Sequence, residues 1–79
     1  MRAVVFDTLG GPEVLAVREV PEPPPPGPGE VSVAVRAAGL NFADTMFVRG
    51  RNFTRPKLPD VPGMEVAGDV VAVGAGVTT

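Results

Sequence analysis

The chain contains no cysteine and no histidine among its 79 residues. The lack of cysteine excludes disulfide bonds, and the two absences together remove the commonest protein ligands of zinc. A folded chain of this size buries only about 60% of the surface that its unfolded form exposes, so small domains usually need a disulfide, a metal or a partner. We therefore expect this chain to need a neighbour that covers its apolar faces, and its length favours a fragment of a longer protein.

Long apolar runs and an excess of basic residues are also lacking. No run approaches the roughly 20 apolar residues that cross a bilayer, and the N-terminus lacks the apolar core of a signal peptide. Seven basic and nine acidic residues give a formal net charge of −2. That balance argues against nucleic-acid binding, which depends on Lys and Arg neutralising phosphates. The composition predicts a soluble, cytoplasmic protein that binds neither nucleic acid nor a membrane.

What the sequence does contain is a pattern typical of β-strands. Residues 2–6 form a short apolar run, and residues 14–20 alternate between two faces. Residues 30–40 alternate most regularly, with valines and an alanine on one face, and residues 65–73 follow as a last strand. Glycine and proline separate these segments, and the turns that they predict lie at residues 10–12, 62–63 and 74–76.

One short helix is predicted after the strand at residues 30–40. Asn41 is a favourable N-cap, and Phe42, Thr45 and Met46 recur at helical spacing before Gly50 ends the helix after about two turns. Short strands with one brief helix predict a mostly β fold, a small and partly open β-barrel. Only a turn and three residues follow the last predicted strand, so we expect the barrel to be incomplete. A barrel with missing strands has exposed sheet edges, which proteins normally avoid, and this also favours a fragment.

A proline-rich segment, residues 21–29, reads PEPPPPGPG. Proline lacks an N–H group and fixes φ, so this segment is expected to be an extended surface loop rather than an inner strand. Such a run also resembles the ligands of SH3-type domains. We favour a stiff connector, because the run is short and lies between two predicted strands.

Motifs along the whole chain resemble, in order, those of the medium-chain dehydrogenase/reductase superfamily and, within it, the zeta-crystallin-like quinone oxidoreductases. The motifs are MRAVVFDTLGGPEVL, PGEV, AGLNFAD, LPDVPGMEVAG and VAVGAGV. The resemblance implies a GroES-like fold, with residues 1–79 as the N-terminal part of the catalytic domain. The family's Rossmann cofactor domain would then be absent from this chain, because no glycine-rich turn is followed by a helix.

Two positions indicate the subclass within that superfamily. The zinc alcohol dehydrogenases, which the chain resembles more distantly, carry Cys in place of Asn41 and His in place of Met64. Neither an amide nor a thioether replaces those zinc ligands. Without a Lewis acid the acceptor must polarise easily, as quinones and enones do. The resemblance therefore implies a zinc-independent enzyme that transfers hydride from NADPH.

The resemblance also implies roles for individual side chains. Asn41 would lie near the nicotinamide or the substrate as a catalytic and cofactor-binding residue, an interpretation that we favour over a simple N-cap. Asp44 would orient a catalytic group, but a first-turn acid is equally favoured by the helix dipole. Met46 and Phe53 would contact the cofactor, although the tyrosine that many family members carry near Phe53 is missing here.

Substrate contacts are implied for Phe42 and Met64, although the i,i+4 spacing of Phe42 and Met46 more often indicates core packing. Glu65 matches a residue that supports the metal in zinc relatives, and here we favour a structural ion pair with an arginine outside the chain. A group of cations either contacts an anionic cofactor or is a solvated loop, and its members are Arg49, Arg51, Arg55 and Lys57.

As a whole, the resemblance implies a parent NADPH-dependent oxidoreductase that reduces a quinone or another conjugated carbonyl. A homodimer is expected for the parent, and this chain alone is expected to be inactive. One alternative is an enoyl-thioester reductase, acting on enoyl-CoA or on a polyketide enoyl group. Another is a GroES-like binding module without enzymatic activity.

Overall fold

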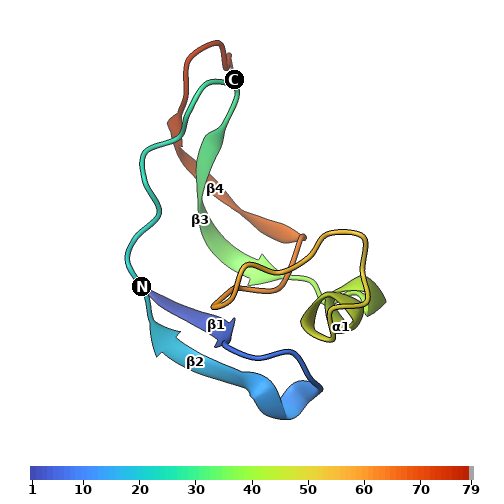
Figure 1. The fold of residues 1–79 in the computed structure, drawn as a ribbon. Coiled ribbons are helices and arrows are strands. Elements are labelled where there is room, and N and C mark those ends of the chain that lie inside the picture. Colours follow the sequence, from blue (N-terminus) through green and yellow to red (C-terminus); the bar gives the residue numbers. More distant parts are fainter. Residues whose placement is uncertain (79) are drawn as a thin grey trace. The chain divides into compact units, whose positions relative to one another are not determined.

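The computed structural model describes residues 1–78 and shows a mostly β chain with one short α-helix (Figure 1). The prediction of a mostly β, GroES-like fold with an incomplete, partly open barrel is confirmed, since the strands of residues 1–78 form two separate two-stranded sheets that do not close into a barrel. The chain divides into two compact units. In chain order the elements are β1 (Arg2–Phe6), the 3₁₀-helix η1 (Pro12–Val14), β2 (Leu15–Glu19), β3 (Val31–Ala38), α1 (Phe42–Val48) and β4 (Val66–Val73).

The first unit contains residues 1–21 and 40–64. Strands β1 and β2 pair antiparallel, from Arg2 opposite Glu19 to Phe6 opposite Leu15. The side chain of Phe6 is 0% exposed, and its ring meets that of Phe47 edge to face, with centroids 5.8 Å apart. Because this contact joins β1 to α1, the small apolar core of the unit lies between the hairpin and the helix.

Backbone hydrogen bonds tie the hairpin to the second half of this unit. Phe6 exchanges two bonds with Asp60, with N···O distances of 3.0 and 3.1 Å, and the Gly10 N–H donates to the Val48 carbonyl at 3.1 Å. The turn predicted at residues 10–12 leads into η1, which the sequence pattern missed. With Pro12 at the start of η1, residue 14 belongs to that helix and the strand begins one residue later than predicted.

Helix α1 follows the predicted capping pattern. Asn41 is the N-cap in an extended conformation, and Gly50, with φ of +73°, donates its N–H to the Phe47 carbonyl at 3.0 Å. Glycine favours this left-handed φ, which explains why the helix ends here.

No helix among residues 1–78 has the length and apolar character needed to cross a membrane.

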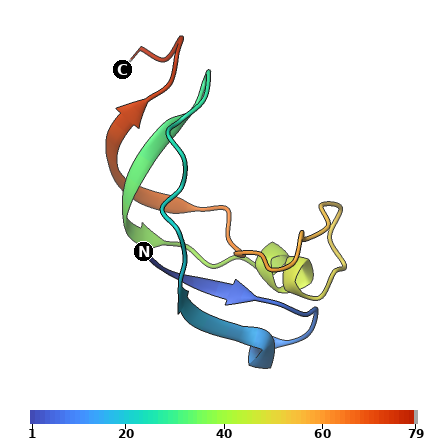
Figure 2. The same cartoon turned by 60° about the vertical axis from the view of Figure 1, so that its left-hand side comes forward.

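The second unit contains residues 22–39 and the chain from residue 65. Strands β3 and β4 pair antiparallel, with Val31 opposite Val73 and irregularities in register on β3; Figure 2 shows the curved ribbon that they form. The prolines before β3 lie outside any strand, as predicted. At Gly68 an added Cβ would collide with the backbone carbonyl of Ala34, so the two strands require glycine at this position.

Candidate functional site

A cavity of about 230 Å³ lies within the first unit, between the tip of the hairpin, helix α1 and the turn at residues 62–63. Its lining is predominantly apolar, and the polar side chains that reach it come mainly from the start and end of the helix. Three segments distant in sequence supply the wall, which consists of Gly10, Gly11, Pro12, Leu15, Leu40, Asn41, Asp44, Thr45, Val48, Arg49, Pro62 and Gly63.

Asn41 and Asp44, the two predicted catalytic residues, both line this cavity. They form a capping box, in which Asp44 Oδ2 accepts the backbone N–H of Asn41 at 2.9 Å. The side chain of Asn41 is exposed, whereas Asp44 is only 5% exposed. Asp44 Oδ1 is buried and has no hydrogen-bond partner among residues 1–78. Helix capping therefore accounts for the contact between Asn41 and Asp44. A catalytic role for either residue stays a prediction.

The other four predicted site residues lie outside the cavity wall. Phe42 and Met64 are 79% and 68% exposed, Phe53 is fully exposed, and Met46 is half-buried. The core packing that the spacing of Phe42 and Met46 favoured is therefore wrong for Phe42, because the buried face of α1 carries Asp44 and Val48 instead. Cofactor and substrate contacts for these four residues stay predictions.

Sequence reasoning missed the contribution of the hairpin tip to the cavity. Gly10, Gly11 and Pro12 were interpreted as a turn only, yet they form one wall together with Leu15. The Gly-Gly-Pro motif was visible, but its position opposite Asn41 depends on long-range packing. No local periodicity carries that information.

Glu13 and Arg49 shape the electrostatics beside the hairpin tip. Backbone hydrogen bonds, from Glu13 itself and from Gly11, lower the pKa of the Glu13 carboxyl, and the positive charge of Arg49 contributes in the same direction. The N–H of Gly11 donates to Glu13 Oε1 at 3.1 Å. This carboxylate therefore stabilises the turn that forms one wall of the cavity.

The donor chemistry of the chain does not fit a transition-metal site. Asn41 and Met64 offer an amide and a thioether at the two positions discussed above, and the sequence contains no thiol or imidazole. Among residues 1–78, no group of three or more acidic side chains is placed to hold a metal ion.

Glu65 belongs to the second unit and is exposed rather than buried in an apolar strand. Its carbonyl accepts the N–H of Gly39 at 3.0 Å, and an added Cβ at Gly39 would collide with its carboxylate. The ion pair with an arginine outside the chain stays a prediction.

The sequence matches the family described as the alcohol dehydrogenase GroES-like domain over residues 27–79. The synaptic vesicle membrane protein VAT-1 homolog of Rattus norvegicus is 49% identical over 99% of this chain, but only over 20% of its own length. A quinone oxidoreductase of Pseudomonas aeruginosa is 48% identical over 98% of the chain and 23% of its own length. This chain thus spans about a fifth of the length of these relatives.

Solved structures show the same fold. A human VAT-1 homolog-like protein superposes with a TM-score of 0.90 at 42% identity, over 100% of this chain and 25% of its own. A mycobacterial protein complexed with NADPH gives a TM-score of 0.88 at 45% identity, over 99% and 23%. The chain therefore belongs to the alcohol dehydrogenase GroES-like domain family, within the medium-chain dehydrogenase/reductase superfamily, and it is similar to the quinone oxidoreductases of that superfamily.

Proposed function

We propose that residues 1–79 are the N-terminal part of the catalytic domain of an NADPH-dependent, zinc-independent oxidoreductase. Its acceptor is a quinone or another conjugated carbonyl. The observation that carries this proposal is the cavity, into which the capped start of α1 brings Asn41 and Asp44 together. Similarity to quinone oxidoreductases over nearly the whole chain supports it.

Two features of the chain support this acceptor class, the lack of zinc ligands and the mainly apolar cavity wall. A simple ketone needs a Lewis acid or a strong proton donor as hydride arrives, and the chain contains no cysteine or histidine to hold zinc. A quinone accepts hydride at one end of its conjugated system and a proton on the resulting oxyanion, which yields the hydroquinone. The mainly apolar wall of the cavity suits such a ring.

The residues present fit only part of the cofactor. Residues 1–78 contain no strand followed by a glycine-rich turn and a helix, which is the unit that binds a dinucleotide pyrophosphate. We therefore propose that a Rossmann domain elsewhere in the parent protein holds most of NADPH, and that this segment alone is inactive. The bound cofactor supplies the hydride, and this segment supplies the acceptor side of the site.

Within this segment, the proposal gives Asn41 the direct role. Its exposed side chain lines the cavity, where an amide N–H can donate to the oxygen of the acceptor. Asp44 fixes the start of the helix and thereby the position of Asn41. Proposed contacts of Phe42 and Met64 with the acceptor, and of Met46 and Phe53 with the cofactor, depend on parts of the protein beyond these residues.

The test is NADPH oxidation by the parent-length protein, measured in parallel with 1,4-benzoquinone and with an enoyl-CoA. We expect quinone-dependent oxidation with the higher kcat/KM. A preference for the thioester would instead assign the protein to the enoyl-thioester reductases. A protein that neither binds nor oxidises NADPH would refute the enzymatic proposal and leave the GroES-like binding module.

A further inference from the structure

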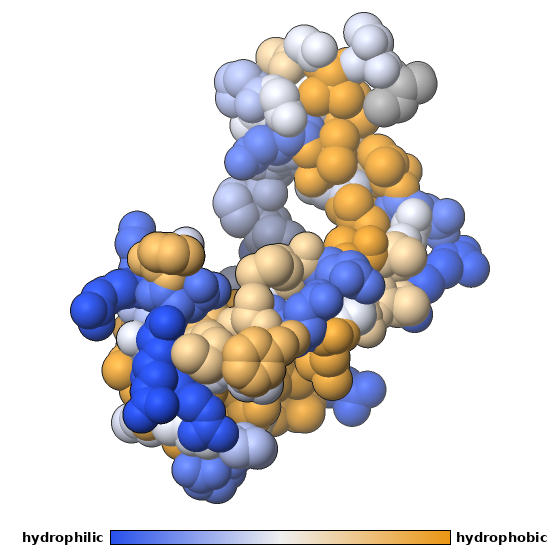
Figure 3. Space-filling model, turned by 90° about the vertical axis from the view of Figure 1, so that its right-hand side faces the viewer, coloured by the Kyte–Doolittle hydropathy of each residue, from blue (hydrophilic) through white to orange (hydrophobic). Residues whose placement is uncertain are grey.

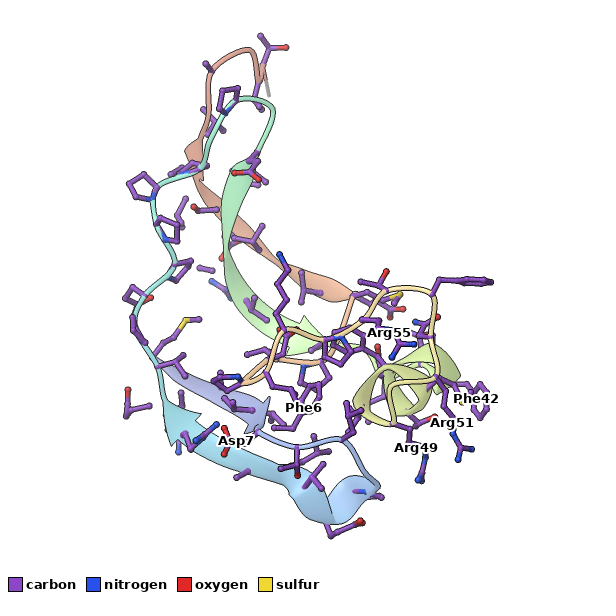
Figure 4. All side chains as sticks on the ribbon, in the orientation of Figure 1. Phe6, Asp7, Phe42, Arg49, Arg51 and Arg55 are labelled. Carbon is purple, nitrogen blue, oxygen red and sulfur yellow. The ribbon has the colours of Figure 1, made fainter. Side chains whose placement is uncertain are left out.

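The structure separates Arg49 from the other cations that follow α1. Arg49 is the C-cap of the helix and lines the cavity, and Figure 4 shows it extending from the end of α1 on the side of η1. Arg51, Arg55 and Lys57 lie outside the cavity wall. Of the cations in residues 1–78, only Arg49 therefore reaches the space in which we place the acceptor.

The charge of Arg49 is not neutralised within the described part of the chain, where it forms no ion pair. Its attraction to Glu13 is weak, because backbone hydrogen bonds from Glu13 itself and from Gly11 lower the pKa of the Glu13 carboxyl more than the charge of Arg49 does. Glu13 also lies outside the cavity wall. The Arg49 guanidinium can therefore bind an anion in the cavity without breaking an ion pair among these residues.

Hydrogen-bond donors stand at the two ends of α1 in this wall. Asn41 is the N-cap and Arg49 the C-cap, eight positions apart in the sequence, which corresponds to about 12 Å along the helix axis. Between them, the hydroxyl of Thr45 donates to the Phe42 carbonyl at 2.7 Å. The rest of the wall is mainly apolar, and Figure 3 shows strongly hydrophilic side chains next to hydrophobic ones on the face that it displays.

The single carboxylate of the wall belongs to Asp44. Its Oδ2 accepts the backbone N–H of Asn41 at 2.9 Å, and its Oδ1 is buried. The carboxylate is thus held at the Asn41 end of the helix. Since like charges repel, an anionic group in the cavity is favoured at the opposite end, beside Arg49.

We propose that the acceptor is a conjugated carbonyl that carries an anionic group, a carboxylate or a sulfonate, on a short side chain. This inference rests on the proposed function and narrows its substrate class. Asn41 binds the carbonyl oxygen, and Arg49 binds the anion through two parallel N–H···O bonds. The span of about 12 Å exceeds the length of one quinone ring, so a ring with a side chain suits it.

Arg49 is then a specificity-determining residue, because the anionic group takes no part in hydride transfer. An anionic acceptor also fits Arg49 better than the cofactor does. The pyrophosphate of a dinucleotide is bound by a glycine-rich turn at the start of a helix, whereas Arg49 stands at the end of one. The three cations outside the cavity wall remain available to the phosphates of NADPH.

The experiment compares two acceptors in NADPH oxidation by the parent-length protein. One is a 1,4-naphthoquinone with a carboxyethyl side chain, and the other is the matching primary amide, which has nearly the same shape but no charge. We expect the carboxylate to have a kcat/KM about tenfold higher than that of the amide, mainly through KM. The ratio of the two kcat/KM values is the readout, because differences in intrinsic reactivity cancel when it is compared between protein variants.

Arg49→Gln should reduce this ratio to about one, and Arg49→Glu should reverse it. Arg49→Lys should keep part of it, because a lysine retains the charge but not the paired donors of arginine. The matched control is Arg2→Gln, which changes an exposed arginine of β1 outside the cavity wall and should keep the wild-type ratio. Circular dichroism establishes that each variant is folded.

Equal kcat/KM values for the two acceptors in the wild-type protein would overturn the inference and leave the proposed oxidoreductase activity standing. An unchanged ratio in folded Arg49→Gln would also overturn it, and a raised KM for NADPH in that variant would assign the cation to the cofactor. An equal loss of preference in Arg2→Gln would indicate a nonspecific effect of charge and would refute the role of Arg49. No turnover with either acceptor would refute the proposed function itself, and the inference with it.

Discussion

Asp44 Oδ2 accepts the backbone N–H of Asn41 at 2.9 Å. The residue proposed to contact the acceptor is therefore positioned by an aspartate in the first turn of the helix that it caps. The same carboxyl is 5% exposed, with Oδ1 lacking a partner among residues 1–78. Burial of an unpaired oxygen is unfavourable. The capping box and the packing of α1 must therefore outweigh that cost in the folded chain.

Substitutions at Asn41 separate its capping role from its proposed catalytic role. Aspartate caps a helix as well as asparagine does, whereas alanine does not. Asn41→Asp should therefore leave the free energy of unfolding within a few tenths of a kcal/mol, while Asn41→Ala lowers it by about 1 kcal/mol. Both variants lose the amide N–H donor, so both should lower kcat about tenfold or more. Stopped-flow turnover and chemical denaturation of the parent protein provide the two readouts.

If Asn41→Asp keeps the wild-type kcat, Asn41 is only a cap and the catalytic assignment is wrong. A matched control is Asn52→Asp, because Asn52 lies in the loop after α1 and outside the cavity wall.

Phe6 is predicted to dominate the stability of the first unit. Its ring is 0% exposed and packs on Phe47, so Phe6→Ala removes both a buried ring and the contact between β1 and α1. We expect a loss of about 3–5 kcal/mol in the free energy of unfolding, measured by urea denaturation. Val17→Ala, on an exposed position of β2, should change it by less than about 0.5 kcal/mol. Equal effects would contradict the described core.

Gly68 is predicted to be required for the pairing of β3 with β4. An added methyl group would meet the carbonyl of Ala34, which is backbone and cannot rotate away. Gly68→Ala should therefore destabilise the second unit by about 1–3 kcal/mol or more. Gly27→Ala is the control, because its Cβ would approach only the side chain of Glu30. Amide hydrogen exchange of β3 reports the difference, and unchanged protection in Gly68→Ala would refute this account.

Glu13 should make the hairpin tip sensitive to acid. Its pKa is lowered in the folded chain by backbone hydrogen bonds, with a smaller contribution from Arg49. A depressed pKa means that the carboxylate stabilises the fold above its ordinary pKa of 4.5 and that this stabilisation is lost as the pH falls through the lower, folded value. NMR titration of the Glu13 carboxyl should give a midpoint below 4.5. In Glu13→Gln the contribution of this carboxylate to the pH dependence of the stability should disappear. A Glu13 titration midpoint above 4.5 would contradict the described turn.

Local sequence patterns predicted most of the secondary structure, because each element is specified by residues that are close together in the sequence. Alternation at residues 31–38 and the Asn41 cap were sufficient for β3 and α1. The 3₁₀-helix η1 was missed, because Pro12 fits both a turn and the first residue of a helix.

The cavity could not be predicted in the same way. Its wall joins Gly10 and Gly11 to Asn41 and Gly63. Long-range contacts bring these segments together, namely the packing of Phe6 on Phe47 and the backbone hydrogen bonds that the hairpin forms with residues 48 and 60. The exposure of Phe53 could not be predicted either, because no periodicity assigns a loop residue to a buried or an exposed face.

The most direct test of the central claim is quinone-dependent NADPH oxidation by the parent protein before and after exhaustive treatment with a metal chelator. Because Asn41 and Met64 provide no zinc ligand, the account predicts the same kcat/KM in both samples and no gain on adding Zn²⁺. Loss of turnover on chelation, with recovery when Zn²⁺ is restored, would contradict it and show that the reaction depends on a metal.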